Sequence, residues 1–221
     1  MSILFVLLTY IVIIAVNYYI RTPQPAPPEL RAAIPRPQAP VMIKEFGFSV
    51  PQDYRFHPGH TWAMREGREN VRVGLDSFAT ELAGKIDRIE VVQPSRWVRQ
   101  GQRLMTITAD GTTFDLLSPV EGVVMAVNDD VVKNPSLAES DPYKDGWIAM
   151  LKSWDFLMNE KNLLQGSMVA PWMHYNVARL NKSLETVNPG LAQDGGVPLK
   201  GLLLKVNPEL RRRLIKEFFL N

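Results

Sequence analysis

The chain has 221 residues, with 25 basic and 23 acidic side chains and a net charge of +2 at neutral pH. A charge this small does not indicate a nucleic-acid partner. The chain has no cysteines, which excludes disulfides, thiolate nucleophiles, cysteine-ligated zinc and iron–sulfur clusters.

The first segment, Ile3–Ile20, is an apolar run without a charged residue. At ~1.5 Å rise per residue, a helix of this length spans roughly 27 Å, close to the ~30 Å hydrocarbon core of a bilayer. The two tyrosines at its end would then lie at the membrane interface. The sequence therefore predicts a transmembrane helix over residues 1–21, with anchoring side chains at Ile3, Phe5, Leu8, Ile11, Ile14, Tyr18 and Tyr19.

A cleaved signal peptide and a buried core helix are the alternatives for this run. No Lys or Arg precedes it and its end is bulky, unlike a signal peptide, and core helices seldom run this long without a polar face. The basic residues that follow are Arg21, Arg31, Arg36 and Lys44. They favour a single-pass membrane protein with a cytoplasmic globular domain, although the reverse topology stays open because the excess is small and dispersed.

Residues 22–45 are predicted to be a linker, with seven prolines between Thr22 and Pro40. Proline fixes φ and removes a backbone donor, so neither a helix nor a sheet propagates through this segment. An extended spacer is expected. It serves either as a plain tether or as a strap along a partner subunit.

Residues 46–152 change to short β-like runs separated by turn residues. Asp76 is expected to cap a short helix that Gly84 ends, and Asn134–Pro135 is expected to start a second one. The pattern predicts a mainly β domain, a small antiparallel sandwich or barrel with short helices.

Several motifs of this region carry a family resemblance through their order and spacing. They are His60-Thr61-Trp62, Val73-Gly74-Leu75-Asp76-Ser77-Phe78-Ala79, Ser118-Pro119-Val120-Glu121-Gly122, Asn134-Pro135, Asp141-Pro142-Tyr143 and Gly146-Trp147-Ile148. From about Phe56 to Lys152 the chain resembles the glycine cleavage H-protein. The resemblance implies a barrel-sandwich hybrid fold, as in lipoyl domains.

The resemblance also implies one lysine at a hairpin tip, eight residues before the proline of the Ser-Pro-Val segment, that carries lipoate. Counting back from Pro119 gives Gly111, and no lysine lies between Lys85 and Lys133. Asp110–Gly111 favours a two-residue hairpin turn, because both residues tolerate positive φ. We therefore expect the hairpin to be kept without its arm, and we expect no cofactor.

Two histidines, His57 and His60, lie three residues apart, which suits metal ligation only with a third ligand nearby. The intervening Pro58–Gly59 makes the segment a turn, so a structural role is expected. No Gly-rich phosphate loop or nucleophile motif occurs, and we expect no catalytic residues, no metal site and no enzymatic activity.

Residues 153–221 are predicted to form a helical extension without a counterpart in the H-protein pattern. Ser167 is expected to cap a helix whose apolar stripe is formed by Met173, Val177, Leu180 and Leu184. This stripe either packs on the barrel or docks against another subunit.

A last helix is predicted to open at Asn207–Pro208, with Leu210, Leu214 and Phe218 on one face. Its basic residues are either a solvated face or a contact with anionic lipid headgroups. They are Arg211, Arg212 and Arg213.

The leading functional hypothesis is a non-catalytic, membrane-anchored structural subunit of a larger membrane complex, such as a respiratory or photosynthetic one. Its expected partners are integral membrane subunits and the lipid bilayer. The alternatives are a lipoyl-type carrier whose attachment site is displaced, for example to Lys85 or Lys133, and a metal or small-ligand module that uses His57 and His60.

Overall fold

The computed structural model describes residues 9–14, 42–45, 48–185 and 200–220. The chain divides into two compact units, residues 1–38 and 39–221. In the first unit, residues 9–14 are helical and expose Ile11 and Ile14. Within the described ranges no helix is both long enough and apolar enough to cross a bilayer. The other predicted anchor positions lie outside the described residues: Ile3, Phe5, Leu8, Tyr18 and Tyr19.

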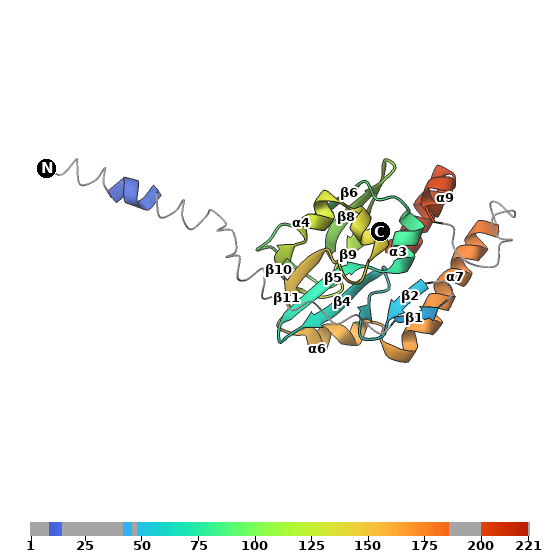
Figure 1. Cartoon of the computed structure of the whole chain (residues 1–221), viewed down its shortest axis with the longest axis horizontal. Coiled ribbons are helices and arrows are strands. Elements are labelled where there is room, and N and C mark those ends of the chain that lie inside the picture. The colour runs from blue at the N-terminus through green and yellow to red at the C-terminus, as the bar shows by residue number, and fades with distance from the viewer. Residues whose placement is uncertain (1–8, 15–41, 46–47, 186–199, 221) are drawn as a thin grey trace. The chain divides into compact units, whose positions relative to one another are not determined.

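The second unit is built mainly from antiparallel strands, as the sequence predicts (Figure 1). The strands are β1 (Met42–Glu45), β2 (Phe48–Pro51), β3 (Arg55–Phe56), β4 (Thr61–Glu66), β5 (Asn70–Leu75), β6 (Arg88–Val91), β7 (Trp97–Val98), β8 (Arg103–Ala109), β9 (Thr112–Leu117), β10 (Gly122–Val127) and β11 (Ala149–Lys152). They form a two-stranded sheet β1-β2, a six-stranded sheet β3-β4-β5-β11-β10-β7 and a three-stranded sheet β6-β8-β9.

The predicted linker range, residues 22–45, extends too far at its end. Met42–Glu45 pairs with Phe48–Pro51 as a strand. No proline lies between Pro40 and Pro51, so the backbone donors needed for a ladder are present in this stretch. The start of the predicted linker, residues 22–41, lies outside the described residues.

Three short helices accompany the strands: α3 (Ser77–Ala83), α4 (Asp129–Lys133) and α5 (Ser136–Ser140). Asp76 caps α3 by accepting from the Ala79 backbone N–H at 2.8 Å, and Gly84 ends it with φ 75, both as predicted. A Cβ on Gly84 would collide with the backbone of Gly201, so glycine is required there for close packing as well as for its φ.

The second predicted helix start is displaced by one residue. Pro135 occupies the N-cap position of α5, and Asn134 instead ends α4 while its Oδ1 accepts a hydrogen bond from the Ser136 hydroxyl. Helix α4, in contrast, was not predicted from the sequence. Its cap is Asn128, whose side chain accepts from the Asp130 N–H.

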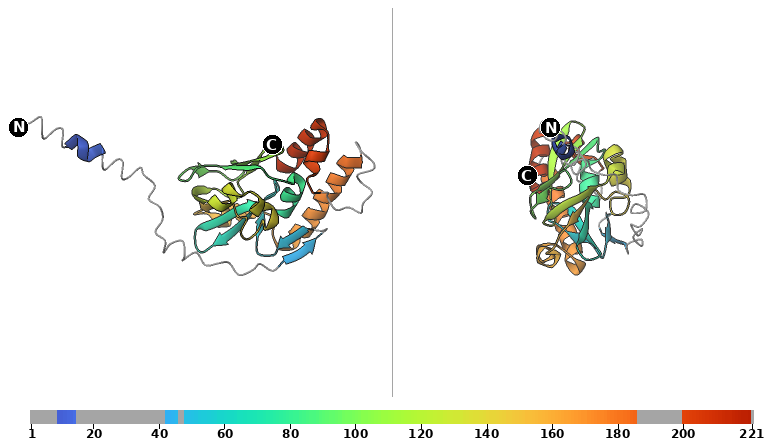
Figure 2. Two further views of the ribbon diagram at one scale, coloured as in Figure 1. Left: turned by 45° about the horizontal axis from the view of Figure 1, so that its top comes forward. Right: turned by 90° about the vertical axis from the view of Figure 1, so that its left-hand side faces the viewer.

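The C-terminal part is helical, as predicted. It comprises α6 (Phe156–Asn159), a 3-10 turn at Glu160–Asn162, another at Gly166–Met168, α7 (Val169–Glu185), α8 (Leu202–Lys205) and α9 (Pro208–Phe219). Asn207 caps α9 and Pro208 follows at its start. Ser167 does not cap α7, because it lies inside the preceding 3-10 turn. Figures 1 and 2 show α3, α7 and α9 on one side of the second unit, opposite β10 and α4.

The apolar stripe of α7 packs inside its own chain. Met173, Val177, Leu180 and Leu184 are each at most 5% exposed and belong to the same core as the sheets. Of the two predicted roles of the stripe, packing within the chain is confirmed, and the prediction of these four side chains as a contact for another subunit is corrected. Helical periodicity marks the apolar face of a helix but does not say whether its own chain covers that face.

Candidate functional site

The hairpin formed by β8 and β9 has the two-residue turn that its sequence predicts. Ala109 pairs with Thr112, and the loop between them is Asp110–Gly111 with φ values of 47° and 71°. Positive φ at both central residues matches the right-handed twist of the flanking strands. Both turn residues are exposed, and neither the strands nor the turn contains a lysine.

Residues distant in sequence hold this turn on both sides. The Asp110 N–H donates to Asp87 Oδ2 at 2.7 Å, and Lys85 Nζ lies 3.8 Å from the other oxygen of Asp87. On the other strand, Arg211 Nη1 donates to Thr112 Oγ1 at 2.7 Å. The turn therefore lies between the segment that follows α3 and the start of α9.

Gly111 is expected to be the sensitive residue of the turn. Replacing Gly111 with Ala forces a Cβ into left-handed backbone and should cost about 1 kcal/mol of unfolding free energy. Nothing lies within contact distance of a Cβ at this position, so the cost is conformational. Chemical denaturation measures it, and exposed Thr113→Ala on the same hairpin is the control. A Gly111→Ala protein as stable as the parent would contradict the strained turn.

Helix α9 covers the inner side of the hairpin. Phe219 stacks on Phe114 of β9 with ring centroids 4.6 Å apart and 9° between planes. Arg211 also donates to the backbone carbonyls of Leu204 and Val206. The guanidinium of Arg211, which is half-buried, is thus held by its own chain, and its contact with a partner or lipid stays a prediction. Arg212 and Arg213 are exposed, and their contact with lipid stays a prediction.

His57 and His60 both make contacts within the fold. His60 is fully buried, and its Nδ1 lies 2.8 Å from Asp76 Oδ2. Its ring stacks between Phe78 and Trp172, with centroids 4.2 and 4.9 Å away. His57 Nδ1 accepts from the Gly59 N–H at 3.0 Å. Among the described residues no group of three His, Cys, Asp or Glu side chains is placed to hold a metal.

His57 gives the fold a pH dependence. Burial, and to a smaller extent His60, lowers the pKa of His57 from 6.5 to about 4. Between these pKa values the unfolded chain holds a proton that the folded chain lacks. The contribution of neutral His57 to the unfolding free energy is therefore fully present above pH 6.5 and is lost as the pH falls toward 4. The total loss is on the order of 3 kcal/mol.

Urea unfolding across this pH range tests the effect in the parent and in His57→Asn. Asparagine keeps an acceptor near the Nδ1 position and does not titrate. We expect a flatter dependence of the unfolding free energy on pH in the variant. Equal slopes in the two proteins would mean that another group carries the dependence.

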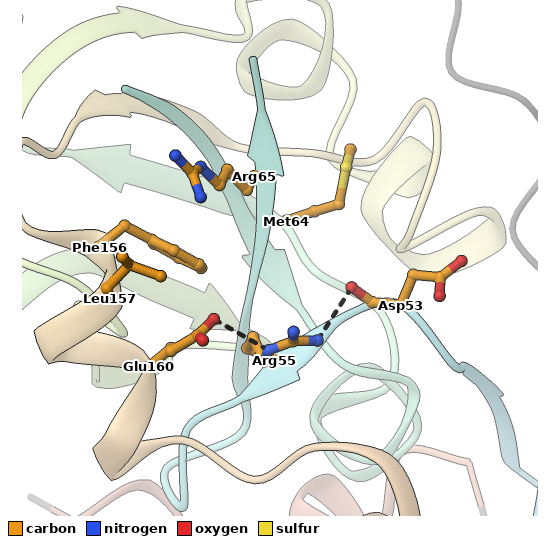
Figure 3. A pocket seen from close by; sticks show the side chains of 7 residues that line it. All are labelled: Asp53, Arg55, Met64, Arg65, Phe156, Leu157 and Glu160. Carbon is orange, nitrogen blue, oxygen red and sulfur yellow. Dashed lines mark hydrogen bonds and ion pairs between the residues drawn. The ribbon is translucent and has the colours of Figure 1, made fainter. Parts of the chain in front are cut away.

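A pocket of about 300 Å³ lies between strands β3 and β4 and helix α6 (Figure 3). Arg55 crosses it, with Nε 3.3 Å from Glu160 Oε2 and Nη1 donating to the Asp53 carbonyl. The guanidinium of Arg65 lies over the Phe156 ring at 5.8 Å. This volume is at the lower limit for small-ligand sites. The pocket was not predicted from the sequence. The remaining lining residues are Met64 and Leu157.

The residues that hold the hairpin turn were not predicted from the sequence either. Asp87 and Asp110 are separated by 23 residues, and Arg211 and Thr112 by 99. No local motif marks such pairs. The family resemblance indicates the turn as a functional position, but it does not indicate Asp87 or Arg211.

Comparison with known proteins extends over the domain just described. The sequence model of the glycine cleavage H-protein family matches residues 54–174, past the Lys152 limit of the resemblance and into α7. The glycine cleavage system H protein of Legionella pneumophila is 39% identical over 100 residues, which cover 45% of this chain and 79% of that protein. The protein of the same name from Thermus thermophilus is 33% identical over 106 residues, covering 48% and 82%.

A solved structure of a glycine cleavage system H protein from Mycobacterium marinum superimposes with a TM-score of 0.45 and 27% identity, covering 47% of this chain and 86% of that one. The family model matches more than half of the chain. The chain is also more than 30% identical to relatives most of whose length it covers. This chain belongs to the glycine cleavage H-protein family.

Proposed function

We propose that this chain is a non-carrier member of its family, which acts as a membrane-tethered structural subunit of a larger complex. The observation that carries the proposal is the hairpin turn, whose two residues, Asp110 and Gly111, have no side-chain amine. The family resemblance implies a lipoyl arm attached through an amide to lysine. An amide of this kind requires a primary amine, and Gly111 has no side chain.

The surroundings of the turn support a rigid rather than a swinging element. Asp87 holds the Asp110 backbone, and Arg211 holds Thr112. The stack of Phe219 on Phe114 adds a buried contact beneath the same strand. A hairpin fixed in this way presents an unchanging surface, which suits a subunit whose role is contact with integral membrane proteins.

The membrane tether in this proposal is supported by the uncharged run Ile3–Ile20. Membranes that contain the full chain are washed with alkaline carbonate, which removes peripheral proteins. We expect the parent to stay with the membrane and the double variant Ile11→Arg, Ile14→Arg to be released. Release of the parent would exclude the tether and leave the non-carrier reading untouched.

Native isolation with intact-mass measurement tests the non-carrier role. We expect the chain to leave the membrane in mild detergent together with integral membrane proteins and to have the mass of its unmodified sequence. A lone monodisperse monomer would contradict the structural-subunit role. A mass increase equal to a lipoyl group would contradict the non-carrier role.

A lipoyl-type carrier with a displaced attachment site is the second candidate, and the names of the relatives favour it. Lys85 is the residue to test, because its side chain is 83% exposed and lies beside Asp87, which holds the hairpin turn. Lys85→Arg would abolish any lipoyl mass increase if this lysine is the attachment site. Lys133→Arg, which changes the exposed lysine at the end of α4, tests the other candidate, and only the variant of the true attachment site would lose the mass increase.

A further inference from the structure

Two tryptophans stack on the surface at the edge of the six-stranded sheet. Trp97 lies in the edge strand β7 and Trp154 follows β11, and their ring centroids are 5.8 Å apart with 12° between planes. The side chains are 48% and 56% exposed. Lys152 places Nζ 5.4 Å from the Trp154 ring. Neither tryptophan belongs to the buried core.

More apolar surface follows directly along the chain. Leu157 and Met158 of α6 are 60% and 55% exposed. Four residues of chain reach at most ~14 Å. The Trp97 segment also meets α6, because Gln100 Nε2 donates to the Asn159 carbonyl at 2.9 Å. Single exposed apolar residues are ordinary, whereas a contiguous group marks an interaction site. We call Trp97, Trp154, Leu157 and Met158 the tryptophan surface.

Basic side chains lie on the segments that carry the tryptophan surface or contact them. Those that are exposed or half-buried are Arg65, Arg96, Arg99, Lys152 and Lys161. The acidic residues on these segments are Glu69, Glu121, Asp155 and Glu160. Glu69 pairs with Lys152 at 3.2 Å and Glu160 pairs with Arg55, a sixth basic residue. Asp155 is the exposed acid between Trp154 and α6. The balance is positive, so the complementary partner is anionic.

We propose that the tryptophan surface rests on the headgroup layer of an anionic lipid bilayer. Indole rings prefer this layer because they combine an apolar face with a polar N–H, and basic residues near it are attracted by anionic lipid. A stable protein interface takes roughly 20–30 residues from each partner, far more than these four side chains supply. The inference rests on the membrane tether of the proposed function, which would hold this surface at a bilayer.

The experiment uses the full chain reconstituted into vesicles of phosphatidylcholine, with or without phosphatidylglycerol, whose acyl chains carry bromine. Bromine quenches tryptophan fluorescence only at short range. We expect quenching in the anionic vesicles, and we expect most of it to vanish in Trp97→Phe, Trp154→Phe. The matched control is Trp172→Phe, which changes a tryptophan that stacks against His60 inside the fold.

A second measurement distinguishes membrane binding through the tether from membrane binding through the tryptophan surface. In the Ile11→Arg, Ile14→Arg background, binding to anionic vesicles depends on the domain alone. Adding Arg99→Gln and Lys152→Gln is expected to weaken that binding roughly thirtyfold, the effect of two basic residues near an anionic surface. Arg88→Gln, Lys133→Gln, which removes two exposed charges elsewhere, is the control.

Three outcomes would overturn the inference. The first is a chain that stays on the vesicles while Trp97 and Trp154 contribute nothing to the quenching; the tether would then stand alone. The second is equal quenching with and without phosphatidylglycerol. The third is protection of both indoles from aqueous acrylamide by a copurifying protein or a second copy of the chain, with no quenching by lipid. The non-carrier role is unaffected by each of them, since intact mass decides it.

Discussion

Ending the chain after Val206, which removes α9, is expected to abolish cooperative unfolding of the domain. Leu214, Phe218 and Phe219 of this helix are at most 1% exposed. Burying one large apolar side chain contributes ~1.5–3 kcal/mol, so the loss of the helix approaches the ~5–15 kcal/mol that stabilises a typical domain. The uncovered Phe114 and His60 rings add further exposed apolar surface.

A point variant makes the same test quantitative. Phe219→Ala should lower the unfolding free energy by about 3–5 kcal/mol, the usual cost of emptying a buried phenylalanine site. Leu220→Ala is the neighbouring control, since that side chain is 49% exposed, and it should change stability little. Guanidinium unfolding followed by tryptophan fluorescence measures both. A truncated chain with a sharp, parent-like transition would show that α9 is an appendage rather than part of the core.

Asp76→Ala is expected to have the second-largest effect of a single change. Asp76 is fully buried and serves two partners: Oδ1 accepts from the Ala79 N–H at 2.8 Å, and Oδ2 lies 2.8 Å from His60 Nδ1. Losing a helix cap costs about 1 kcal/mol, and a buried polar group left without its partner costs a further ~1–3 kcal/mol. The sum is about 3 kcal/mol.

The variant Asp76→Asn separates the two contributions, because asparagine is as good an N-cap as aspartate but presents only one acceptor oxygen. We expect it to fall between the parent and Asp76→Ala. Thermal unfolding ranks the three proteins, with exposed Asp145→Ala as the control for losing an acidic charge. If Asp76→Ala unfolds at the same temperature as the parent, the pair with His60 does not stabilise the fold.

Local rules predicted the parts of the fold that depend on a few neighbouring residues. The Asp76 cap, the Gly84 end of α3 and the Asp110–Gly111 turn follow from side-chain hydrogen bonding and from φ preferences, which act within four residues. The buried face of α9 follows from its spacing. These elements are the ones whose energetics are decided locally.

The rest depends on contacts that no local pattern contains. The periodicity of α7 predicts an apolar face but does not say whether the chain's own core or another subunit packs against it. The structure places this face in the chain's own core. Trp97 and Trp154 come together because β10 pairs with β7 on one side and with β11 on the other, which the sequence does not reveal. The Asp87 contact with the hairpin turn likewise requires the sheet to have formed.

The position of α9 also bears on the order in which the domain is completed during synthesis. Translation releases the strands of the hairpin long before residues 208–219 exist, and Phe114 then has no Phe219 to stack on. The nascent barrel leaves the ribosome with an open apolar side, the state in which chains aggregate or recruit chaperones. Packing of α9 on the hairpin waits for residues 208–219 and joins segments of high sequence separation, which makes it intrinsically slow. The domain is therefore finished only after α9 has been released and has packed on the hairpin.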